Sequence, residues 1–174
     1  IVGKSKQTGT TVTFKPDPTI FQTVDFSFDI LSKRLRELAF LNKGIEISIS
    51  DERQKDKEHM FKYKNGISEF VEYLNKNKNA VHHKIIHCER EKDSVIVEFA
   101  MQYNDGYSTN EIFSFANNIN THEGGTHLSG FKTALTRSAN QFAKNKDLLK
   151  GLSATLSGND LTEAPGTSEV SESY

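Results

Sequence analysis

The chain has 174 residues, a length that suits one domain and at most part of a second. Its net charge of −1 argues against a protein that coats nucleic acid over its whole surface, so any such contact must come from a local patch. The single cysteine, Cys88, excludes an internal disulfide and fits a reducing, cytoplasmic location. The first residues lack the apolar core of a signal peptide, no apolar run is long enough for a membrane span, and the absent initiator Met is typical of a piece of a longer protein.

The first predicted elements are a strand and a helix. Alternating β-branched residues predict a strand over residues 10–14, which the two prolines of KPDP end. Leucines at helical spacing predict a helix over residues 29–41, capped by Ser27 or Asp29 and ended by residues 42–44.

A hairpin and a second helix follow. IEISISD alternates, which predicts a strand with Ile45, Ile47 and Ile49 on one face. The mixed-charge run DERQKDKEH predicts the turn, and HMFKYKN predicts the returning strand. GISEFVEYLNKNKN is predicted to be an amphipathic helix from its apolar residues Ile67, Phe70, Val71 and Leu74.

The second half is predicted to contain three strands and a long helix. KIIHCER and DSVIVEFAMQY predict two strands joined by a charged turn, NDGY predicts another turn, and EIFSFANN predicts a third strand. The spacing of apolar residues after Gly124 and Gly125 predicts a helix to about Lys146, with its stripe at Leu128, Phe131, Leu135, Ser138 and Phe142. SGNDLTE has the character of a helix start, and residues 164–174 are predicted to be a disordered tail. This order of elements predicts an α+β fold with a largely antiparallel sheet and helices packed on one face.

The cluster HHKIIHC does not predict a metal site. On a strand, His83 and His87 face one side and Cys88 the other. Structural zinc requires four ligands, and no second Cys/His pair occurs at a suitable spacing. A polar edge strand is therefore favoured. No G-x-S-x-G motif occurs and Cys88 lies in a strand, so the sequence predicts no catalytic nucleophile.

Gly124 and Gly125 leave two interpretations open. The helix that follows them presents N–H groups that can bind an anion, but the glycines are not part of a Walker loop. The favoured interpretation is that they give the chain room to enter the helix.

The same helix carries a basic stripe. At 100° per residue, Arg137, Asn140 and Lys144 are predicted to lie opposite the apolar stripe, with Lys132 and Thr136 beside it. Such cations can neutralise a phosphate backbone without reading bases, although an ordinary solvated face fits the charges equally well.

Five long blocks resemble a known family. TGTTVTFKPDPTIF, LSKRLRELAFLNKGIEISISDER, GISEFVEYLNKNK, EFAMQYNDGYS and NNINTHEGGTHLSGFKTALTR resemble, in order and spacing, the B subunit of bacterial DNA gyrase. The resemblance covers about residues 8–163. THLSGFKTALTR and EYLNKNK look more like gyrase than like its paralogue, topoisomerase IV.

The resemblance implies a division of the chain. In the family, a GHKL ATP-binding domain precedes a transducer domain, which has a ribosomal-protein-like α+β fold with a left-handed βαβ crossover. Residues 1–17 resemble the C-terminal edge of the ATP-binding domain, residues 18–163 an incomplete transducer domain, and residues 164–174 a tail. The resemblance gives Thr10 a part in holding a water and the adenine of ATP.

The resemblance also implies an activity. Members of the family are ATP-dependent type II DNA topoisomerases, which couple ATP binding and hydrolysis, with Mg²⁺, to DNA strand passage and negative supercoiling. The implied partners are double-stranded DNA and the gyrase A subunit, in a heterotetramer of two A and two B subunits whose B subunits dimerise on ATP binding. Lys132, Arg137 and Lys144 would face the DNA. The family usually has Arg at the position of Lys132, and Lys keeps the charge but loses the bidentate fork.

Several family motifs are absent from this sequence. The catalytic Glu, the adenine-binding Asp and the glycine-rich lid of the GHKL domain would all precede residue 1. A Gln-Thr-Lys loop is expected after DLTE, and the chain has none. We therefore expect the chain alone not to hydrolyse ATP. The B subunit of topoisomerase IV and a stand-alone nucleic-acid-binding module stay open as alternatives.

Overall fold

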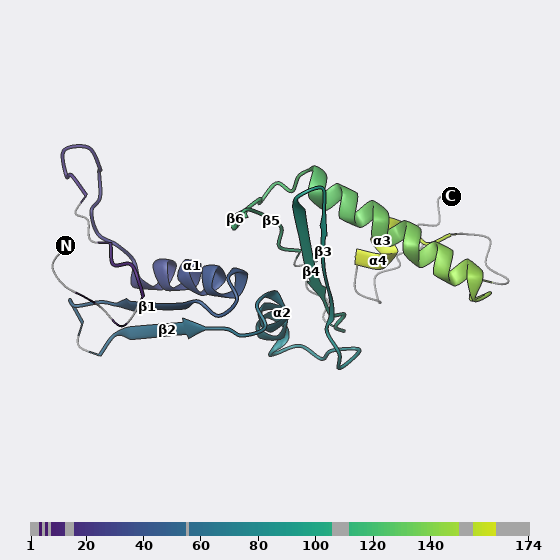
Figure 1. Ribbon diagram of the computed structural model, residues 1–174, viewed down its shortest axis with the longest axis horizontal. Helices are drawn as coiled ribbons and strands as arrows, with labels where there is room; N and C mark the ends of the chain where they lie inside the picture. The colour runs from purple at the N-terminus through teal and green to yellow at the C-terminus, as the bar shows by residue number, and fades with distance from the viewer. Residues whose placement is uncertain are drawn as a thin grey trace, which may run out of the picture.

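The computed structural model describes residues 4, 6, 8–12, 16–54, 56–105, 112–149 and 155–162. It is elongated, with α1, β1 and β2 towards one end and α3 and α4 towards the other (Figure 1). The elements in chain order are α1 (Phe28–Leu41), β1 (Glu46–Ser50), β2 (Glu58–Lys62), α2 (Ile67–Asn75), β3 (Ile86–Lys92), β4 (Val95–Met101), β5 (Phe115–Ala116), β6 (Ile119–Asn120), α3 (Thr126–Asn145) and α4 (Gly158–Thr162).

Helix α1 begins and ends where its sequence predicts. The Ser27 hydroxyl accepts a hydrogen bond from the backbone N–H of Ile30, so Ser27 is the cap. At the other end, the Asn42 side chain donates to the Leu38 carbonyl at 2.8 Å. Gly44 then turns the chain with a φ of 78°, a region that favours glycine.

The hairpin of β1 and β2 packs against α1. The strands pair antiparallel from Glu46 opposite Lys62 to Ser50 opposite Glu58, which confirms the predicted hairpin. In its turn, Asp51 accepts bonds from the Arg53 side chain at 2.8 and 2.9 Å. The Arg53 hydrogen bonds hold the pKa of Asp51 at about 2, because they favour the charged carboxylate.

An aromatic cluster around Phe40 forms the core of this half of the molecule. Phe40 is only 1% exposed. Its ring stacks on Tyr63 at a centroid distance of 3.6 Å and lies 5.0 Å from Phe70 and 5.7 Å from Tyr73. Phe70 in turn lies 5.4 Å from Phe113. The cluster therefore joins α1, α2, the chain after β2 and the chain before β5.

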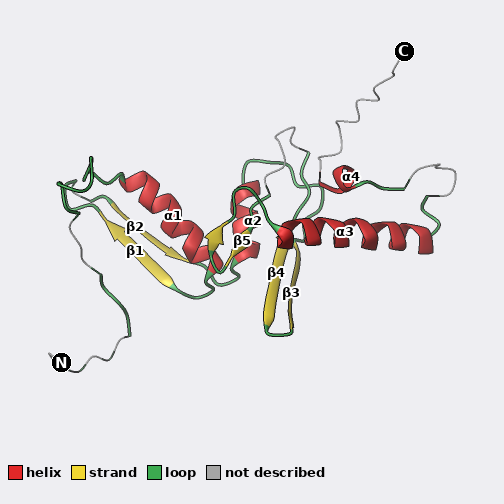
Figure 2. Cartoon of the chain, turned by 90° about the horizontal axis from the view of Figure 1, so that it is seen from above, coloured by secondary structure: helices red, strands yellow, loops and turns green. Residues whose placement is uncertain are grey.

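The hairpin of β3 and β4 connects the two ends of the molecule and projects from its body (Figure 2). The strands pair antiparallel from Ile86 opposite Met101 to Lys92 opposite Val95. A two-residue turn joins them, with positive φ angles of 52° at Asp93 and 63° at Ser94. Helix α2 packs on β4, and Phe99 of β4 lies 5.1 Å from Phe131 of α3.

The arrangement of the strands differs from the prediction. The described strands form three separate antiparallel hairpins, and not one sheet with helices on one face. A βαβ crossover requires a parallel pair, and the described residues contain none. Periodicity identifies strands but not their partners, which is why the mixed α and antiparallel β content is confirmed while the single sheet is not.

Two of the predicted strands also differ from what the structure contains. Residues 10–12 are not in a strand, and residues 13 and 14 lie outside the described part of the chain. An isolated strand has no partner for its backbone hydrogen bonds. EIFSFANN gives only β5, because Asn117 and Asn118 adopt φ angles of 48° and 66° and turn the chain back into β6. The predicted helix start near Gly158 is confirmed by α4, and the predicted tail lies outside the described residues.

We expect Phe40→Ala to destabilise the protein by about 3–5 kcal/mol, because the truncation leaves a cavity among rings that already fill the core. Urea denaturation followed by circular dichroism measures the change. Phe142→Ala is the matched control, since Phe142 is 60% exposed and we expect its loss to cost below about 1 kcal/mol. Equal effects of the two substitutions would show that Phe40 is not a core residue.

Candidate nucleic-acid interface

The turn into α3 explains the two glycines. Gly124 has a φ of 79°, and a side chain on Gly125 would lie 2.8 Å from the His127 ring. The His127 ring itself contacts the Thr121 hydroxyl at 3.2 Å. This geometry supports the structural interpretation of the glycines, and it gives His127 a role in closing the turn.

The packed side of α3 differs from the predicted stripe in its C-terminal half. Ser138 and Phe142 are exposed, whereas Ala143 is buried. Asn140 was predicted to lie opposite the stripe, but it is partly buried and exchanges two hydrogen bonds of 2.8 Å with the backbone of Leu156. These bonds satisfy a polar side chain on the packed side, a possibility that hydrophobic periodicity does not detect.

The exposed face of α3 carries two of the three predicted DNA-facing residues. Arg137 and Lys144 are both exposed and lie seven residues apart, so they occupy one side of the helix. The helix has three Lys or Arg residues and no acidic residue. Lys132 is half-buried, and five residues of helix place it about 140° around the axis from Arg137. The structure therefore brings Arg137 and Lys144 together and sets Lys132 apart.

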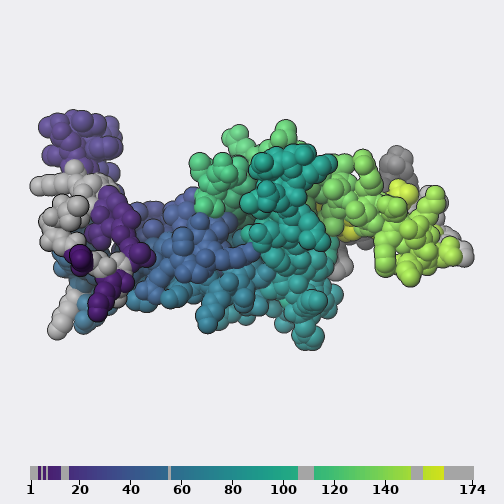
Figure 3. Space-filling model, in the orientation of Figure 1, coloured from purple at the N-terminus to yellow at the C-terminus, as the bar shows by residue number. Residues whose placement is uncertain are grey.

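Thr10 lies far from this helix. It is exposed on the described N-terminal segment, and Figures 1 and 3 show this segment at the opposite end of the molecule from α3. The structure does not bring Thr10 and the basic residues into one site.

A second polar cluster was not predicted from the sequence. On one face of the β3–β4 hairpin, Glu98 receives hydrogen bonds from Lys43 at 2.7 Å and from His87 at 2.9 Å. Lys43 also bonds Glu89 at 2.9 Å. His83 takes no part, because β3 begins only at Ile86 and His83 precedes it. The register of the two strands could have revealed this cluster, because it places Glu89 opposite Glu98.

This cluster has metal-ligating atoms but already holds a cation. The ligand atoms of His87, Glu89 and Glu98 lie within 4.8 Å of one another. The Lys43 ammonium bonds both carboxylates, so it supplies the positive charge that a metal ion would bring. A structural zinc site needs four ligands, and this group offers three.

The charges of the cluster support one another. Burial alone would raise the pKa of Glu98, but the hydrogen bonds from Lys43 and His87 outweigh burial and lower it. The bond to Glu98, followed by the bond to Glu89, raises the pKa of Lys43. Because the pKa of Glu98 is lowered, its charged form stabilises the fold above about pH 4.5, and this stabilisation is lost as the pH falls further. Because the pKa of Lys43 is raised, its charged form stabilises the fold below about pH 10.5, and this stabilisation is lost as the pH rises further.

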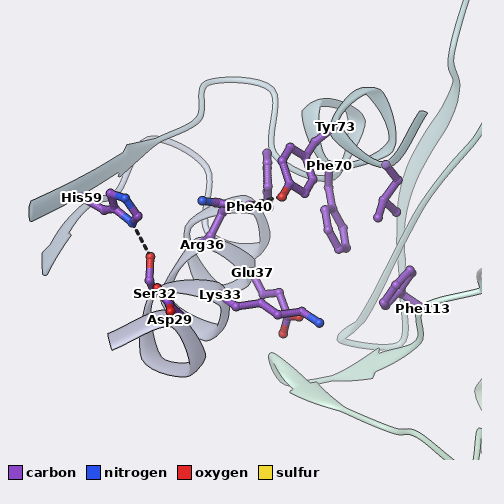
Figure 4. Close-up of a pocket in the computed structure, with 11 residues that line it drawn as sticks. Asp29, Ser32, Lys33, Arg36, Glu37, Phe40, His59, Phe70, Tyr73 and Phe113 are labelled. Carbon is purple, nitrogen blue, oxygen red and sulfur yellow. Dashed lines mark hydrogen bonds between the residues drawn. The ribbon is translucent and has the colours of Figure 1, made fainter. Parts of the chain in front are cut away.

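A groove of about 460 Å³ lies between α1, α2 and Phe113 (Figure 4). Four of its polar side chains are paired with one another. The Ser32 hydroxyl contacts Nδ1 of His59 at 2.6 Å, and Arg36 donates to the Tyr73 hydroxyl at 2.6 Å. No pair here combines a nucleophile with a base that a third group orients, so the groove offers no catalytic arrangement among the described residues.

Comparison with known proteins decides which family this fold belongs to. The sequence profile described as DNA gyrase B matches residues 66–165, more than half of the chain. The chain belongs to the DNA gyrase B family. Within the described residues, no helix is long and apolar enough to cross a membrane.

The gyrase B relatives match nearly the whole chain. The chain is 52% identical to the DNA gyrase B subunit of Halalkalibacterium halodurans over 94% of its own length and 26% of that protein. It is 54% identical to the DNA gyrase B subunit of Myxococcus xanthus, over 93% of the chain and 20% of that protein. The DNA topoisomerase 4 B subunit of Bacillus subtilis is 50% identical, over 93% of the chain and 24% of that protein. The chain thus spans about a quarter or less of these relatives.

Solved gyrase B structures share its fold. The 43K ATPase domain of Thermus thermophilus gyrase B, solved in complex with an aminocoumarin, superposes with a TM-score of 0.73 at 37% identity. The match covers 87% of this chain and 41% of that one. The B subunit of Myxococcus xanthus gyrase gives a TM-score of 0.69 at 23% identity, over 81% of this chain and 42% of that one.

We expect Lys43→Met to raise the pKa of Glu98, because the half-buried carboxylate loses its strongest hydrogen-bond donor. Carboxyl ¹³C NMR titration measures this shift. At neutral pH the variant should lose about 0.5–1 kcal/mol of stability, a small value because the Lys43 side chain is 39% exposed to screening solvent.

The matched control is Lys62→Met, which removes an exposed ion pair with Glu46 on the first hairpin. We expect it to leave stability within about 0.5 kcal/mol and the Glu98 titration unchanged. An unchanged Glu98 pKa in Lys43→Met would contradict the assigned cluster.

Proposed function

We propose that this chain is the part of a gyrase B protein that relays ATP binding and hydrolysis to DNA strand passage and negative supercoiling. Family membership over nearly the full chain is the observation that carries the proposal. Residues 18–163 would be transducer domain, residues 1–17 the edge of the ATP-binding domain, and residues 164–174 a tail. The intact protein would be a type II topoisomerase that works in the cytoplasm with the gyrase A subunit, and its B subunits would dimerise when ATP binds.

The B subunit of topoisomerase IV is the near alternative. Identities of 52% to a gyrase B relative and 50% to a topoisomerase 4 relative do not separate the two. The two differ in DNA substrate and not in chemistry, so supercoiling of relaxed DNA by the intact enzyme is the deciding measurement.

The described residues do not build a nucleotide site by themselves. Thr10 is exposed on the N-terminal segment, and in the groove between α1 and α2 Ser32 is paired with His59 and Arg36 with Tyr73. We infer that Thr10 borders an ATP and Mg²⁺ site whose other groups belong to the rest of a longer protein. No catalytic step is assigned to residues of this chain.

The exposed face of α3 is the proposed contact with double-stranded DNA. Arg137 and Lys144 stand on one side of a rigid helix of 20 residues that has no acidic residue to offset them. Two cations at this spacing can neutralise phosphates and carry no sequence information. Lys132 would contribute from the border of the packed side, by extending its amine beyond its apolar stem.

We expect Arg137→Ala and Lys144→Ala each to weaken duplex binding by the 174-residue chain and to lower the slope of log K against log salt by about 0.9, since each removes one phosphate contact. Fluorescence anisotropy with a labelled duplex at several salt concentrations gives the slope. Lys76→Ala is the control, because Lys76 is also an exposed lysine and lies at the end of α2. A slope that changes as much with Lys76→Ala would contradict the α3 assignment.

In an intact gyrase B protein that carries this sequence, Lys132→Ala should impair supercoiling and the stimulation of ATP hydrolysis by DNA. Basal nucleotide binding should stay unchanged, because α3, the helix that carries Lys132, lies away from the N-terminal segment (Figure 1). Supercoiling gels and coupled ATPase assays with and without DNA measure these effects. Undiminished stimulation by DNA would remove Lys132 from the proposed DNA contact.

We expect the purified 174-residue chain to hydrolyse no ATP above background, because the family's catalytic Glu and lid are not in its sequence. A phosphate-release assay with Mg²⁺ and saturating ATP tests this expectation, and the intact gyrase B protein is the positive control. Turnover that persists through purification would contradict the proposed division of the chain.

A stand-alone nucleic-acid-binding module is the second candidate function, and the basic α3 is the feature that favours it. It requires tight, salt-dependent binding by the isolated chain, in the micromolar range or below, where the first proposal requires only weak binding.

A further inference from the structure

Lys43 is held at its base and along its stem, unlike an ordinary surface lysine. Its backbone lies between Asn42, which ends α1, and Gly44, whose N–H donates to the Tyr63 carbonyl at 2.9 Å. Its stem crosses Gly66, where a Cβ would lie 2.7 Å from Cγ of Lys43 and 2.8 Å from its Cε. Because this stem has little freedom left to lose, the ion pairs at its end cost less entropy than those of a freely exposed lysine.

The surface beneath this stem is itself fixed. Gly66 is buried and precedes the first residue of α2. The Glu69 carboxylate accepts hydrogen bonds from the backbone N–H groups of Lys64 and Asn65 at 2.9 and 2.7 Å, which closes the loop that leads into the helix. The ammonium of Lys43 therefore reaches the two carboxylates of the β3–β4 hairpin from a defined position.

One of these carboxylates is next to the residue that contacts α3. Glu98 and Phe99 are consecutive on β4, so their side chains leave opposite faces of the strand. Lys43 bonds Glu98 at 2.7 Å on one face. On the other face, the Phe99 ring lies 5.1 Å from the ring of Phe131 on α3. A shift of β4 at Glu98 would therefore pass directly to the helix.

Helix α2 also holds the hairpin, at its inner end. It packs on β4, and Asn75 donates to the Gln102 side chain at 2.9 Å, just beyond the strand. Gln102 is four residues from Glu98, about 13 Å along an extended chain. One attachment near the end of a projecting hairpin leaves it free to pivot, and a second attachment at this distance opposes the rotation (Figure 2).

We propose that Lys43 is a positioning residue, whose ion pairs with Glu89 and Glu98 fix the orientation of the β3–β4 hairpin and of α3 relative to α1. Lys144 lies thirteen residues beyond Phe131, about 20 Å along the helix, so a rotation of about 10° at Phe131 moves it by about 3 Å. Its use in relaying ATP state to DNA rests on the proposed function, whereas the geometry stands without it.

The distance between α1 and α3 in the 174-residue chain tests the positioning role without reference to function. Spin labels at Ile30→Cys and Phe142→Cys, in a Cys88→Ser background, report this distance by double electron–electron resonance, and the two native side chains are 71% and 60% exposed. Lys43→Met should widen the distance distribution by about 3 Å or more, because the hairpin loses its attachment near the end of α1. Lys43→Arg keeps the charge and should restore the narrow distribution.

Two further variants control this measurement. Lys62→Met removes the ion pair with Glu46 inside the first hairpin and should leave the distribution unchanged. Glu98→Gln keeps the shape of the side chain without its charge and should widen the distribution as Lys43→Met does, so the test does not depend on one variant. Circular dichroism checks that each variant is folded. An unchanged width in a folded Lys43→Met or Glu98→Gln variant, or an equal change in Lys62→Met, overturns the positioning role.

Rescue in the intact gyrase B protein that carries this sequence tests the link to the relay. Lys43→Met should lower the stimulation of ATP hydrolysis by DNA about threefold or more and leave basal hydrolysis within about twofold, while Lys43→Arg should restore the stimulation. A substitution that merely destabilises the protein would lower both rates together. An unmodified protein without supercoiling or stimulation overturns the proposed function. Full stimulation in Lys43→Met, despite a widened distance distribution, overturns the role of Lys43 in the relay alone.

Discussion

The packing of one ring, Phe40, fixes the arrangement of the N-terminal half. Phe40 projects from the last turn of α1 and stacks on Tyr63 after β2, while Phe70 and Tyr73 of α2 close over it. Because the three elements meet at one buried side chain, their relative positions are fixed together. Three residues further on, Lys43 reaches the carboxylates of the β3–β4 hairpin. The aromatic core and this ion-pair cluster are thus consecutive along the chain, and together they connect the first hairpin to the second.

Helix α3 has to serve two environments. Its packed side contacts β4 through Phe131 and the segment before α4 through Asn140, while its other side presents Arg137 and Lys144 to solvent. The polar anchor at Asn140 matters for this division, since the bonds to Leu156 orient the C-terminal half of the helix without an apolar stripe there. A rigid helix held in this way can present cations at fixed spacing, which is what a contact with the phosphate backbone requires.

Local signals in the sequence predicted the helices and hairpins well. They did not predict which strands pair or which distant side chains meet. The Ser27 cap, the end of α1 at Asn42 and the hairpin of β1 with β2 all follow from short-range chemistry. The three separate hairpins do not, because periodicity carries no information about which strands meet. Asn140 was misplaced because its burial depends on Leu156, 16 residues away. The Lys43 cluster was missed for the same reason, since Lys43 and Glu89 are 46 residues apart.

The position of Lys132 suits a lysine better than its sequence alone suggests. An arginine that clamps a phosphate needs its planar fork held in a fixed direction. Lys132 is half-buried beside the packed side of α3. A lysine in such a place can cover apolar surface with its stem while its amine reaches water. A point charge at the end of a flexible stem can follow a moving phosphate backbone without a fixed geometry. In the function proposed here the DNA segment is transported, and a contact that holds charge without fixing register is compatible with that movement.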